Sequence, residues 1–265
     1  MTPKISSLRE RLRSLDRALV AFSGGVDSAL LARVAVEEMG DRVEAVTAVS
    51  PSLPAAERES ACRLAGEIGI DHRLIETHEG DNPAYVANGV DRCYHCKKEL
   101  FSRMQALLEE SGGTVLLYGA IGDDLDDFRP GLKAATEAQA IAPLAELGYT
   151  KEEVREDARA LGLEVWDKPA MACLASRVPH GTPVTPEVLA QIERGERVLR
   201  GLGFRQFRLR HHEEVARIEL GPAEMARAFS PDLRQEITKQ LHAAGYRFVA
   251  LDLDGYRSGS LSPLR

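Results

Sequence analysis

One short stretch combines glycines, hydroxyls and a carboxylate at a spacing suited to phosphate chemistry: Ser23-Gly24-Gly25-Val26-Asp27-Ser28. It lies between an apolar run and a helical pattern. Glycine tolerates positive φ and lets a ligand approach the backbone closely. Backbone amides and the Ser23 and Ser28 hydroxyls would then meet at a helix N-terminus, where the helix dipole favours an anion. The spacing predicts a phosphate-binding turn, although an ordinary strand-to-helix turn also uses such glycines.

Two cysteines just before a predicted helix form a second candidate site. Cys93 and Cys96 are separated by two residues, a spacing with which both thiolates can bind one metal. The pair by itself leaves structural zinc, a redox pair and plain packing open. Zinc is favoured, because a thioredoxin-type pair follows a strand of a βαβ unit and this pair follows a loop.

A third cysteine lies in the proline-containing stretch 168–183, which has little periodicity and reads as a linker or a site loop. The neighbouring Ser176 and Arg177 favour a site loop around Cys173. The remaining cysteine, Cys62, is expected to pack within a helix.

Four aspartates crowd residues 123–127, directly after a predicted strand. A solvated acidic loop would explain them. At the carboxyl edge of a nucleotide-binding sheet, magnesium beside ATP is the better interpretation, because Mg²⁺ prefers one or two carboxylates together with phosphate oxygens. Asp124 and Asp127 are the candidate ligands, and both need not bind directly.

Three arginines are expected on one face of a hairpin near the C-terminus. Alternation places Phe207 and Leu209 on one face of a strand and Arg208 and Arg210 on the other, with Arg217 outward on the next strand. Such arginines are often merely solvated. Two guanidinium groups would nevertheless suffice to hold a phosphate or a dicarboxylate.

The elements that must position these residues alternate between strand and helix. This alternation predicts an α/β protein with a doubly wound, mostly parallel sheet, whose ligand site lies at the carboxyl ends of the strands. We expect a first domain over 1–168, a site loop or linker over 169–185 and a smaller C-terminal α/β domain over 186–265. The expected strands are 18–22, 43–49, 72–77, 114–118, 204–210, 215–220 and 246–251, and the main expected helices are 29–35, 55–69, 97–110, 151–161, 186–202 and 222–244. The residues from Tyr256 onward carry no pattern and are expected to fray.

Composition narrows the function classes. The 265 residues are 44% hydrophobic and 28% charged, with a net charge of −7, which argues against a general grip on nucleic acid. No apolar run approaches the roughly 20 residues of a membrane span, and the first residues lack the apolar core of a secretory signal. With four cysteines, we expect a reducing, cytoplasmic setting in which paired cysteines indicate metal binding or catalysis.

The glycine-rich stretch resembles the PP-loop of ATP pyrophosphatases, which cleave ATP to AMP and pyrophosphate. It is not a Walker P-loop, because no Gly-Lys-Ser/Thr closes it. The resemblance implies an adenine nucleotide alpha-hydrolase-like fold and the binding of ATP with Mg²⁺. The residues that it assigns to pyrophosphate and to support of the magnesium ion are Ser23, Gly24, Gly25, Asp27 and Ser28.

Over nearly the whole chain, several motifs in one order resemble the LarE family of ATP-dependent sulfur transferases, which help to build the nickel-pincer nucleotide cofactor. The loop around Cys173 is the most specific of them; the others are segments 92–97, 129–131 and 211–219. Family members adenylylate a carboxylate of pyridinium-3,5-biscarboxylic acid mononucleotide and then replace the activated oxygen with sulfur. In the best-known members, the cysteine that matches Cys173 gives up its own sulfur and becomes dehydroalanine.

The resemblance also assigns roles to other residues. Arg208 and Arg210 match arginines that hold the substrate's phosphate or carboxylates, with Arg217 on the same face, and Ser176, Arg177 and Glu196 fall near the sulfur-donating site. Family members form homo-oligomers, so we expect one here, with a small nucleotide substrate, a possible sulfide donor, and neither nucleic acid nor membrane as a partner.

Two features depart from the sacrificial type. Cys93 and Cys96, together with Cys173, resemble the family branch that binds a [4Fe-4S] cluster with one iron left open, on which an extra sulfide can be presented. Ala120 and Ile121 stand where related enzymes often carry Thr-Asn. The competing interpretations are an amide-forming ligase like NAD or GMP synthetase, a tRNA thiolase, and a non-catalytic nucleotide- and zinc-binding sensor.

Overall fold

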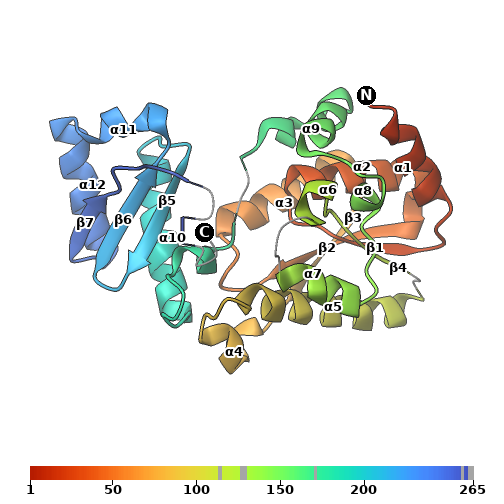
Figure 1. Ribbon diagram of the computed structural model, residues 1–265, viewed down its shortest axis with the longest axis horizontal. Coiled ribbons are helices and arrows are strands. Elements are labelled where there is room, and N and C mark those ends of the chain that lie inside the picture. The colour runs from red at the N-terminus through yellow and green to blue at the C-terminus, as the bar shows by residue number, and fades with distance from the viewer. Residues whose placement is uncertain (113–114, 126–129, 170–171, 258–259, 262–265) are drawn as a thin grey trace. The chain divides into compact units, whose positions relative to one another are not determined.

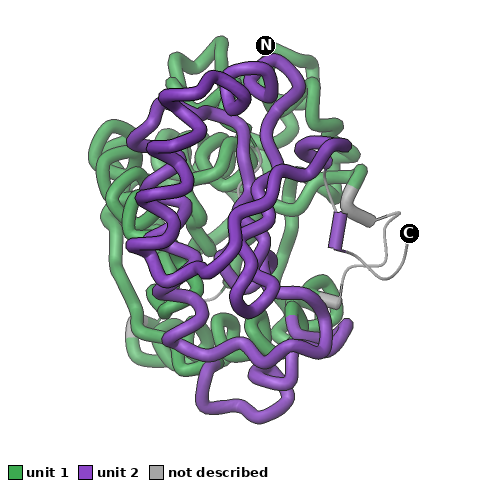
Figure 2. The backbone as a smooth tube through the Cα atoms, turned by 90° about the vertical axis from the view of Figure 1, so that its left-hand side faces the viewer, with its two compact units in different colours: residues 1–79, 93–171 green, residues 80–92, 172–265 purple. Residues whose placement is uncertain are grey.

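The chain forms two compact units in a computed structural model. The first unit comprises residues 1–79 and 93–171, and the second comprises 80–92 and 172–265 (Figure 2). The structure describes all residues except 113–114, 126–129, 170–171, 258–259 and 262–265. Residues 80–92 belong to the same unit as the C-terminal residues, which no pattern in the sequence indicates. The domain boundaries expected from the sequence stay a prediction.

A parallel four-stranded sheet organises the first unit, in the order β3-β2-β1-β4. Parallel strands need crossover helices, so this sheet confirms the predicted doubly wound α/β class. The strands are β1 (Ala18–Ala21), β2 (Val43–Val49), β3 (Asp71–Glu76) and β4 (Val115–Tyr118).

Helices cover both faces of this sheet (Figure 1). On one face, Ala18 and Val20 of β1 share a core with α1, α2, α3 and α9, while Leu19 points to the opposite core with α5 and α7. This period of two fixes which side of β1 each helix contacts. The helices are α1 (Lys4–Arg13), α2 (Val26–Met39), α3 (Ala55–Ile68), α5 (Arg92–Ser111), α6 (Gly122–Leu125), α7 (Pro130–Glu137), α8 (Pro143–Glu146) and α9 (Lys151–Ala160), with 3₁₀ turns at Gly40–Arg42, Glu79–Asp81 and Glu164–Asp167.

The second unit is built on a three-stranded sheet in the order β5-β6-β7. β5 (Phe207–His212) pairs antiparallel with β6 (Val215–Leu220), and β6 pairs parallel with β7 (Phe248–Leu251). Leu209, Leu241 and Tyr246 belong to the core between this sheet and its helices. The helices of the unit are α4 (Pro83–Val86), α10 (Pro186–Gly201), α11 (Pro222–Ala228) and α12 (Pro231–Ala243), with a 3₁₀ turn at Leu174–Arg177.

The single helix expected over 222–244 was wrong, because the chain leaves the helical conformation at Ser230. Pro231 lacks a backbone N–H and disfavours the α region for the residue before it. Ser230 accordingly has φ −62° and ψ 135°, and a new helix begins at Pro231. Among the residues that the structure describes, no helix has the length and apolar character needed to cross a membrane.

Candidate functional site

The glycine-rich turn between β1 and α2 has the conformation that its sequence predicts. Gly24 has φ +69°, and a Cβ there would lie 3.1 Å from the Cα of Ala61 in α3. Gly25 is the N-cap of α2 and offers no side chain to cap the first turn. A helix N-terminus of this kind favours an anion. The positive φ of residue 24 favours glycine, and a side chain there would also require Ala61 to shift slightly.

The two serines of the turn are brought together. Their hydroxyl oxygens lie 3.2 Å apart, and the Ser23 amide donates to the Ser28 hydroxyl at 3.2 Å. Ser28 in turn donates to the carbonyl oxygen of Gly25 at 3.1 Å. These contacts fix a narrow turn whose polar groups converge at the carboxyl end of β1.

Gly119, directly after β4, packs against the start of α2. A Cβ on this residue would lie 2.8 Å from the Ser28 amide nitrogen and 3.0 Å from the Asp27 carbonyl carbon. The neighbouring strand end can approach the phosphate turn this closely only without a side chain. No role for this glycine was expected from the sequence.

Asp27 makes an ion pair that the sequence analysis did not anticipate. Lys151, the first residue of α9, places its Nζ 2.7 Å from both carboxylate oxygens of Asp27. The Lys151 amide also donates to Asp123 at 3.1 Å. Two carboxylates therefore contact one residue beside the phosphate turn, a donor set of the oxygen type that Mg²⁺ prefers.

The two magnesium ligands expected in the acidic stretch are not tested by these contacts. Asp127 lies outside the described residues, and so does the side chain of Asp124.

A second lysine contacts the turn directly. Lys168 places its Nζ 3.3 Å from the carbonyl oxygen of Gly24, and it forms an ion pair with Glu57 of α3 at 2.9 Å. Two cations that the sequence analysis overlooked thus flank the phosphate turn. No local pattern distinguishes either lysine from a surface lysine, so only the fold identifies them.

Cys93 and Cys96 are the second and fifth residues of α5 and do not lie before the helix as expected, because α5 begins at Arg92. Residues three apart are neighbours on a helix surface, so both thiols can still reach one metal. Cys93 is exposed, and Cys96 is half-buried. Within the described part of the chain, no group of three or more His, Cys, Asp or Glu residues is arranged to hold a metal ion.

Cys62 is exposed on α3, so the expectation that it packs inside was wrong. Helical periodicity gives the reason, because Ala61, Leu64 and Ala65 form the buried stripe and leave residue 62 outside it.

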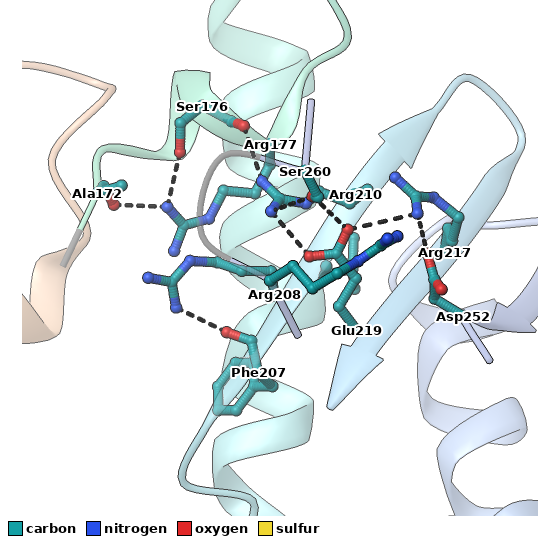
Figure 3. Close-up of polar contacts among 12 residues, drawn as sticks. Ala172, Ser176, Arg177, Phe207, Arg208, Arg210, Arg217, Glu219, Asp252 and Ser260 are labelled. Carbon is teal, nitrogen blue, oxygen red and sulfur yellow. Dashed lines mark hydrogen bonds and ion pairs between the residues drawn. The ribbon is translucent and has the colours of Figure 1, made fainter. Parts of the chain in front are cut away.

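Arg177 determines the backbone path around Cys173 in the second unit. Its Nη1 donates to the carbonyl oxygen of Ala172 at 2.5 Å (Figure 3). The same nitrogen donates to the carbonyl oxygen of Cys173 at 3.0 Å. Ser176 adds a hydroxyl bond of 2.7 Å to the Cys173 carbonyl. Glu196 accepts two hydrogen bonds from the same guanidinium group, from Nε at 2.8 Å and from Nη2 at 3.1 Å. Both charged side chains are buried.

Two residues from the 80–92 segment hold the same loop from another side. The fully buried Asn88 donates to the carbonyl oxygens of Pro179 and Thr182 at 2.8 and 2.9 Å. Arg92 donates to Asn88 and to the Ala175 carbonyl, both at 2.7 Å. The sequence analysis gave these residues no role of their own, although an arginine directly before Cys93 was a usable signal.

The predicted arginine face exists, and it is not a solvated surface. Arg210 lies directly opposite Arg217 across β5 and β6, and Arg208 lies opposite Glu219. Arg208 and Arg210 are buried, at 9% and 5% exposed. Glu219 accepts from Arg210 at 2.8 Å and pairs with Arg217 at 3.3 Å (Figure 3).

Arg208 is a buried arginine whose surroundings include two further arginines, Arg177 and Arg210. Burial lowers the pKa of Arg208, and the positive charge of Arg177 lowers it further. The guanidinium group of Arg208 remains charged at neutral pH despite its burial. In addition, the Nε of Arg210 is buried and has no hydrogen-bond partner among the described residues. An anionic ligand would relieve both costs.

The C-terminal residues take part in this cluster, so the expectation that they fray was wrong for the described ones. The Tyr256 ring lies 5.0 Å from the guanidinium carbon of Arg208. The Ser260 hydroxyl accepts from Arg210 at 2.8 Å and donates to Glu219 at 2.7 Å. A short polar tail carries no periodicity, which is why its role could not be read from the sequence.

The chain is similar to a known family model and to several known proteins. Residues 5–126 match the asparagine synthase family model. A protein of Synechocystis sp. is 46% identical over 98% of this chain and 97% of its own length. Pyridinium-3,5-bisthiocarboxylic acid mononucleotide synthase of Lactiplantibacillus plantarum is 37% identical over 99% of this chain and 95% of its own length. A protein of Methanocaldococcus jannaschii is 26% identical over 96% of this chain.

Proposed function

The chain belongs to the LarE family of PP-loop enzymes, and from this premise we propose that it is an ATP-dependent sulfur transferase for the nickel-pincer nucleotide cofactor. Its substrate would be pyridinium-3,5-biscarboxylic acid mononucleotide, whose carboxylates it converts to thiocarboxylates. The observation that carries the proposal is the likeness to the Lactiplantibacillus plantarum synthase over nearly the full length of both chains.

The first step would be activation of a substrate carboxylate. A carboxylate is a poor electrophile, because oxide is not a leaving group. Attack of its oxygen on the α-phosphorus of ATP forms an acyl adenylate and releases pyrophosphate, and attack of sulfur on the acyl carbon then releases AMP. The amides and hydroxyls of residues 23–28 stabilise charge on the departing pyrophosphate. When bound, Mg²⁺ would supply further neutralisation of that charge, with Asp27 and Asp123 as the described carboxylates suited to hold it.

The arginine face of the second unit is the proposed binding site for the anionic substrate. Arg208, Arg210 and Arg217 present buried or half-buried guanidinium groups on one side of β5 and β6. Planar guanidinium groups bind phosphate and carboxylate through paired hydrogen bonds. The Nε of Arg210, which has no hydrogen-bond partner within the described part of the chain, supports this assignment.

For the sulfur source, we propose a [4Fe-4S] cluster held by Cys93, Cys96 and Cys173. Thiolates are the ligands that such clusters prefer, and the helical spacing of Cys93 and Cys96 suits a shared metal. When bound, a cluster with one open iron would supply a sulfide nucleophile. The chain's own residues position the third thiol: Arg177 and Ser176 fix the carbonyl group of Cys173.

The rival functions make different demands on the same residues. An amide-forming ligase needs ammonia and gives the three cysteines no use, and a tRNA thiolase needs a basic surface that a net charge of −7 does not favour. Metal analysis distinguishes the proposed enzyme, which would contain iron, from a zinc-binding sensor, which would not. We also propose a cytoplasmic homo-oligomer that receives sulfide from a donor.

The test is product analysis with protein purified without oxygen. ATP, Mg²⁺, sulfide and the biscarboxylic substrate should yield AMP, pyrophosphate and a product 16 mass units heavier for each oxygen replaced by sulfur, as judged by mass spectrometry. Formation of ADP and phosphate, or turnover only with ammonia, would refute the proposal.

A further inference from the structure

We propose that Lys151 forms an ion pair with Asp27 in the nucleotide-free protein. When Mg²⁺ binds Asp27, the ammonium group of Lys151 forms an ion pair with the phosphates of ATP instead. The inference rests on the proposed function, since it assigns a role within the ATP site. It concerns a residue for which neither the turn motif nor the loop pattern predicts any task.

The ion pair between Lys151 and Asp27 uses both carboxylate oxygens. The Nζ of Lys151 lies 2.7 Å from both oxygens of Asp27, so a single ammonium engages the whole carboxylate. The two side chains are 33% and 25% exposed, which leaves both within reach of ions and ligands from solvent. A metal ion can therefore compete with the lysine for the same oxygens.

Hydrogen bonds hold the backbone of Lys151, whereas its side chain is held through the ion pair with Asp27. Thr150 and Glu153 form a capping box at the start of α9, and the Lys151 amide donates to Asp123 at 3.1 Å. The amide of Gly122 adds a bond of 2.9 Å to the carbonyl of Tyr149. Lysine carries its charge on a flexible four-carbon stem, so the ammonium group can change partners without moving the helix.

Charge balance gives the exchange its direction. Mg²⁺ prefers a carboxylate together with phosphate oxygens, and it would take Asp27 from the lysine. Asp27 is the second residue of α2 and adjoins the amides of the phosphate turn. The displaced ammonium group thus stays beside the turn, where the triphosphate brings new negative charge. No covalent bond is made or broken. Mg²⁺ replaces Lys151 at the carboxylate of Asp27, and the ammonium group of Lys151 contacts the triphosphate.

The experiment compares Lys151→Met with Lys4→Met as the matched control. Lys4 also reaches α9, with its Nζ 2.7 Å from Glu153, and it is exposed to a similar degree. Mn²⁺ binding is followed by electron paramagnetic resonance without nucleotide, and ATP binding is followed by calorimetry in EDTA and in Mg²⁺.

For Lys151→Met we expect Mn²⁺ to bind about tenfold more tightly and ATP to bind about tenfold more weakly, as loss of one charge-assisted bond implies. Adding Asp27→Asn should abolish the gain in Mn²⁺ affinity. Lys4→Met should leave both affinities unchanged. Lys151→Gln is measured in parallel, so that the result does not depend on the folding of one variant.

Unchanged Mn²⁺ and ATP affinities in both Lys151 variants would overturn the inference and leave an ordinary ion pair. Tighter Mn²⁺ binding with unchanged ATP affinity would also overturn it, because the ammonium would then not move to phosphate. Failure of the proposed function looks different: the unmodified protein itself would bind no ATP or would release no pyrophosphate.

Discussion

Arg177 and Glu196 form a buried ion pair in which Nε and Nη2 donate to the two carboxylate oxygens at 2.8 and 3.1 Å. The pair joins the Cys173 loop to α10 within the second unit. The remaining guanidinium nitrogen of Arg177, Nη1, donates hydrogen bonds to the carbonyl groups of Ala172 and Cys173. Glu196 therefore acts on the cysteine loop through Arg177, as a positioning residue.

Replacing Glu196 by Ala should destabilise the protein by about 3–5 kcal/mol, because an uncompensated buried guanidinium would remain. Urea unfolding measures the change. Arg197→Ala, an exposed neighbour on the same helix, is the control and should shift stability by less than about 0.5 kcal/mol. Equal changes in the free energy of unfolding for Glu196→Ala and Arg197→Ala would show that the Arg177–Glu196 ion pair does not stabilise the protein.

Replacing Arg208 by Ala should weaken binding of the biscarboxylic substrate by about 10- to 100-fold, equivalent to about 1.5–3 kcal/mol for a charge-assisted bond. ATP affinity and metal content should not change. Calorimetry with substrate checks this, and Arg205→Ala, exposed just before β5, is the matched control. An unchanged dissociation constant in Arg208→Ala and in Arg210→Ala would remove these arginines from the substrate site.

Replacing Gly119 by Ala should distort the phosphate turn, because Gly119 follows β4 and packs against the start of α2. A Cβ at 2.8 Å from the Ser28 amide must push α2 or β4 away, at a cost of about 1–3 kcal/mol. We expect weaker ATP binding and a lower melting temperature. In Gly66→Ala, a Cβ would meet nothing within 4 Å, so this helical variant should be as stable as the unmodified protein or more so.

Acidification should destabilise the protein as the pH falls below about 6.5, the ordinary pKa of histidine. Burial lowers the pKa values of His211 and His212, and the charge of Arg217 lowers that of His212 further. The unfolded state therefore binds more protons in the window below 6.5, so stability rises with pH there. Urea unfolding between pH 5 and pH 7.5 measures the slope.

The ring of His212 explains part of this dependence, since its Nε2 accepts a hydrogen bond from Arg217 at 3.1 Å and must be unprotonated to do so. His212→Gln supplies a neutral acceptor and should flatten the slope. A slope as steep as that of the unmodified protein would assign the dependence to other groups, such as His211 or His72, whose pKa values are also lowered by burial.

Any one of the substitutions Cys93→Ala, Cys96→Ala and Cys173→Ala should remove most of the bound iron, because three thiolates are proposed to hold one cluster. Cys62→Ala, which changes an exposed thiol on α3, is the control and should retain it. Iron and sulfide analysis after anaerobic purification provides the measurement.

Mass spectrometry after turnover separates the two sulfur sources. The cluster proposal expects several turnovers per protein with added sulfide and an unchanged mass at Cys173. Loss of the elements of hydrogen sulfide at Cys173 after one turnover would establish the sacrificial route instead.

The sequence by itself determined the parallel α/β sheet and the phosphate turn. Both follow from local patterns: apolar runs of strand length alternate with helical periodicity, and the glycines at 24 and 25 favour a turn before the helix. It also determined that Arg208, Arg210 and Arg217 share a face, because strand alternation fixes side-chain direction.

Tertiary structure decided which distant groups complete these sites. Lys151 reaches Asp27 from 124 residues away, and Ser260 reaches Arg210 from 50 residues away. Nothing in the residues near either partner encodes such a contact, because it depends on where a helix start or a chain end is placed by the rest of the fold. Burial was decided in the same way: alternation gives the arginines a common side, but only packing determines that this side excludes water.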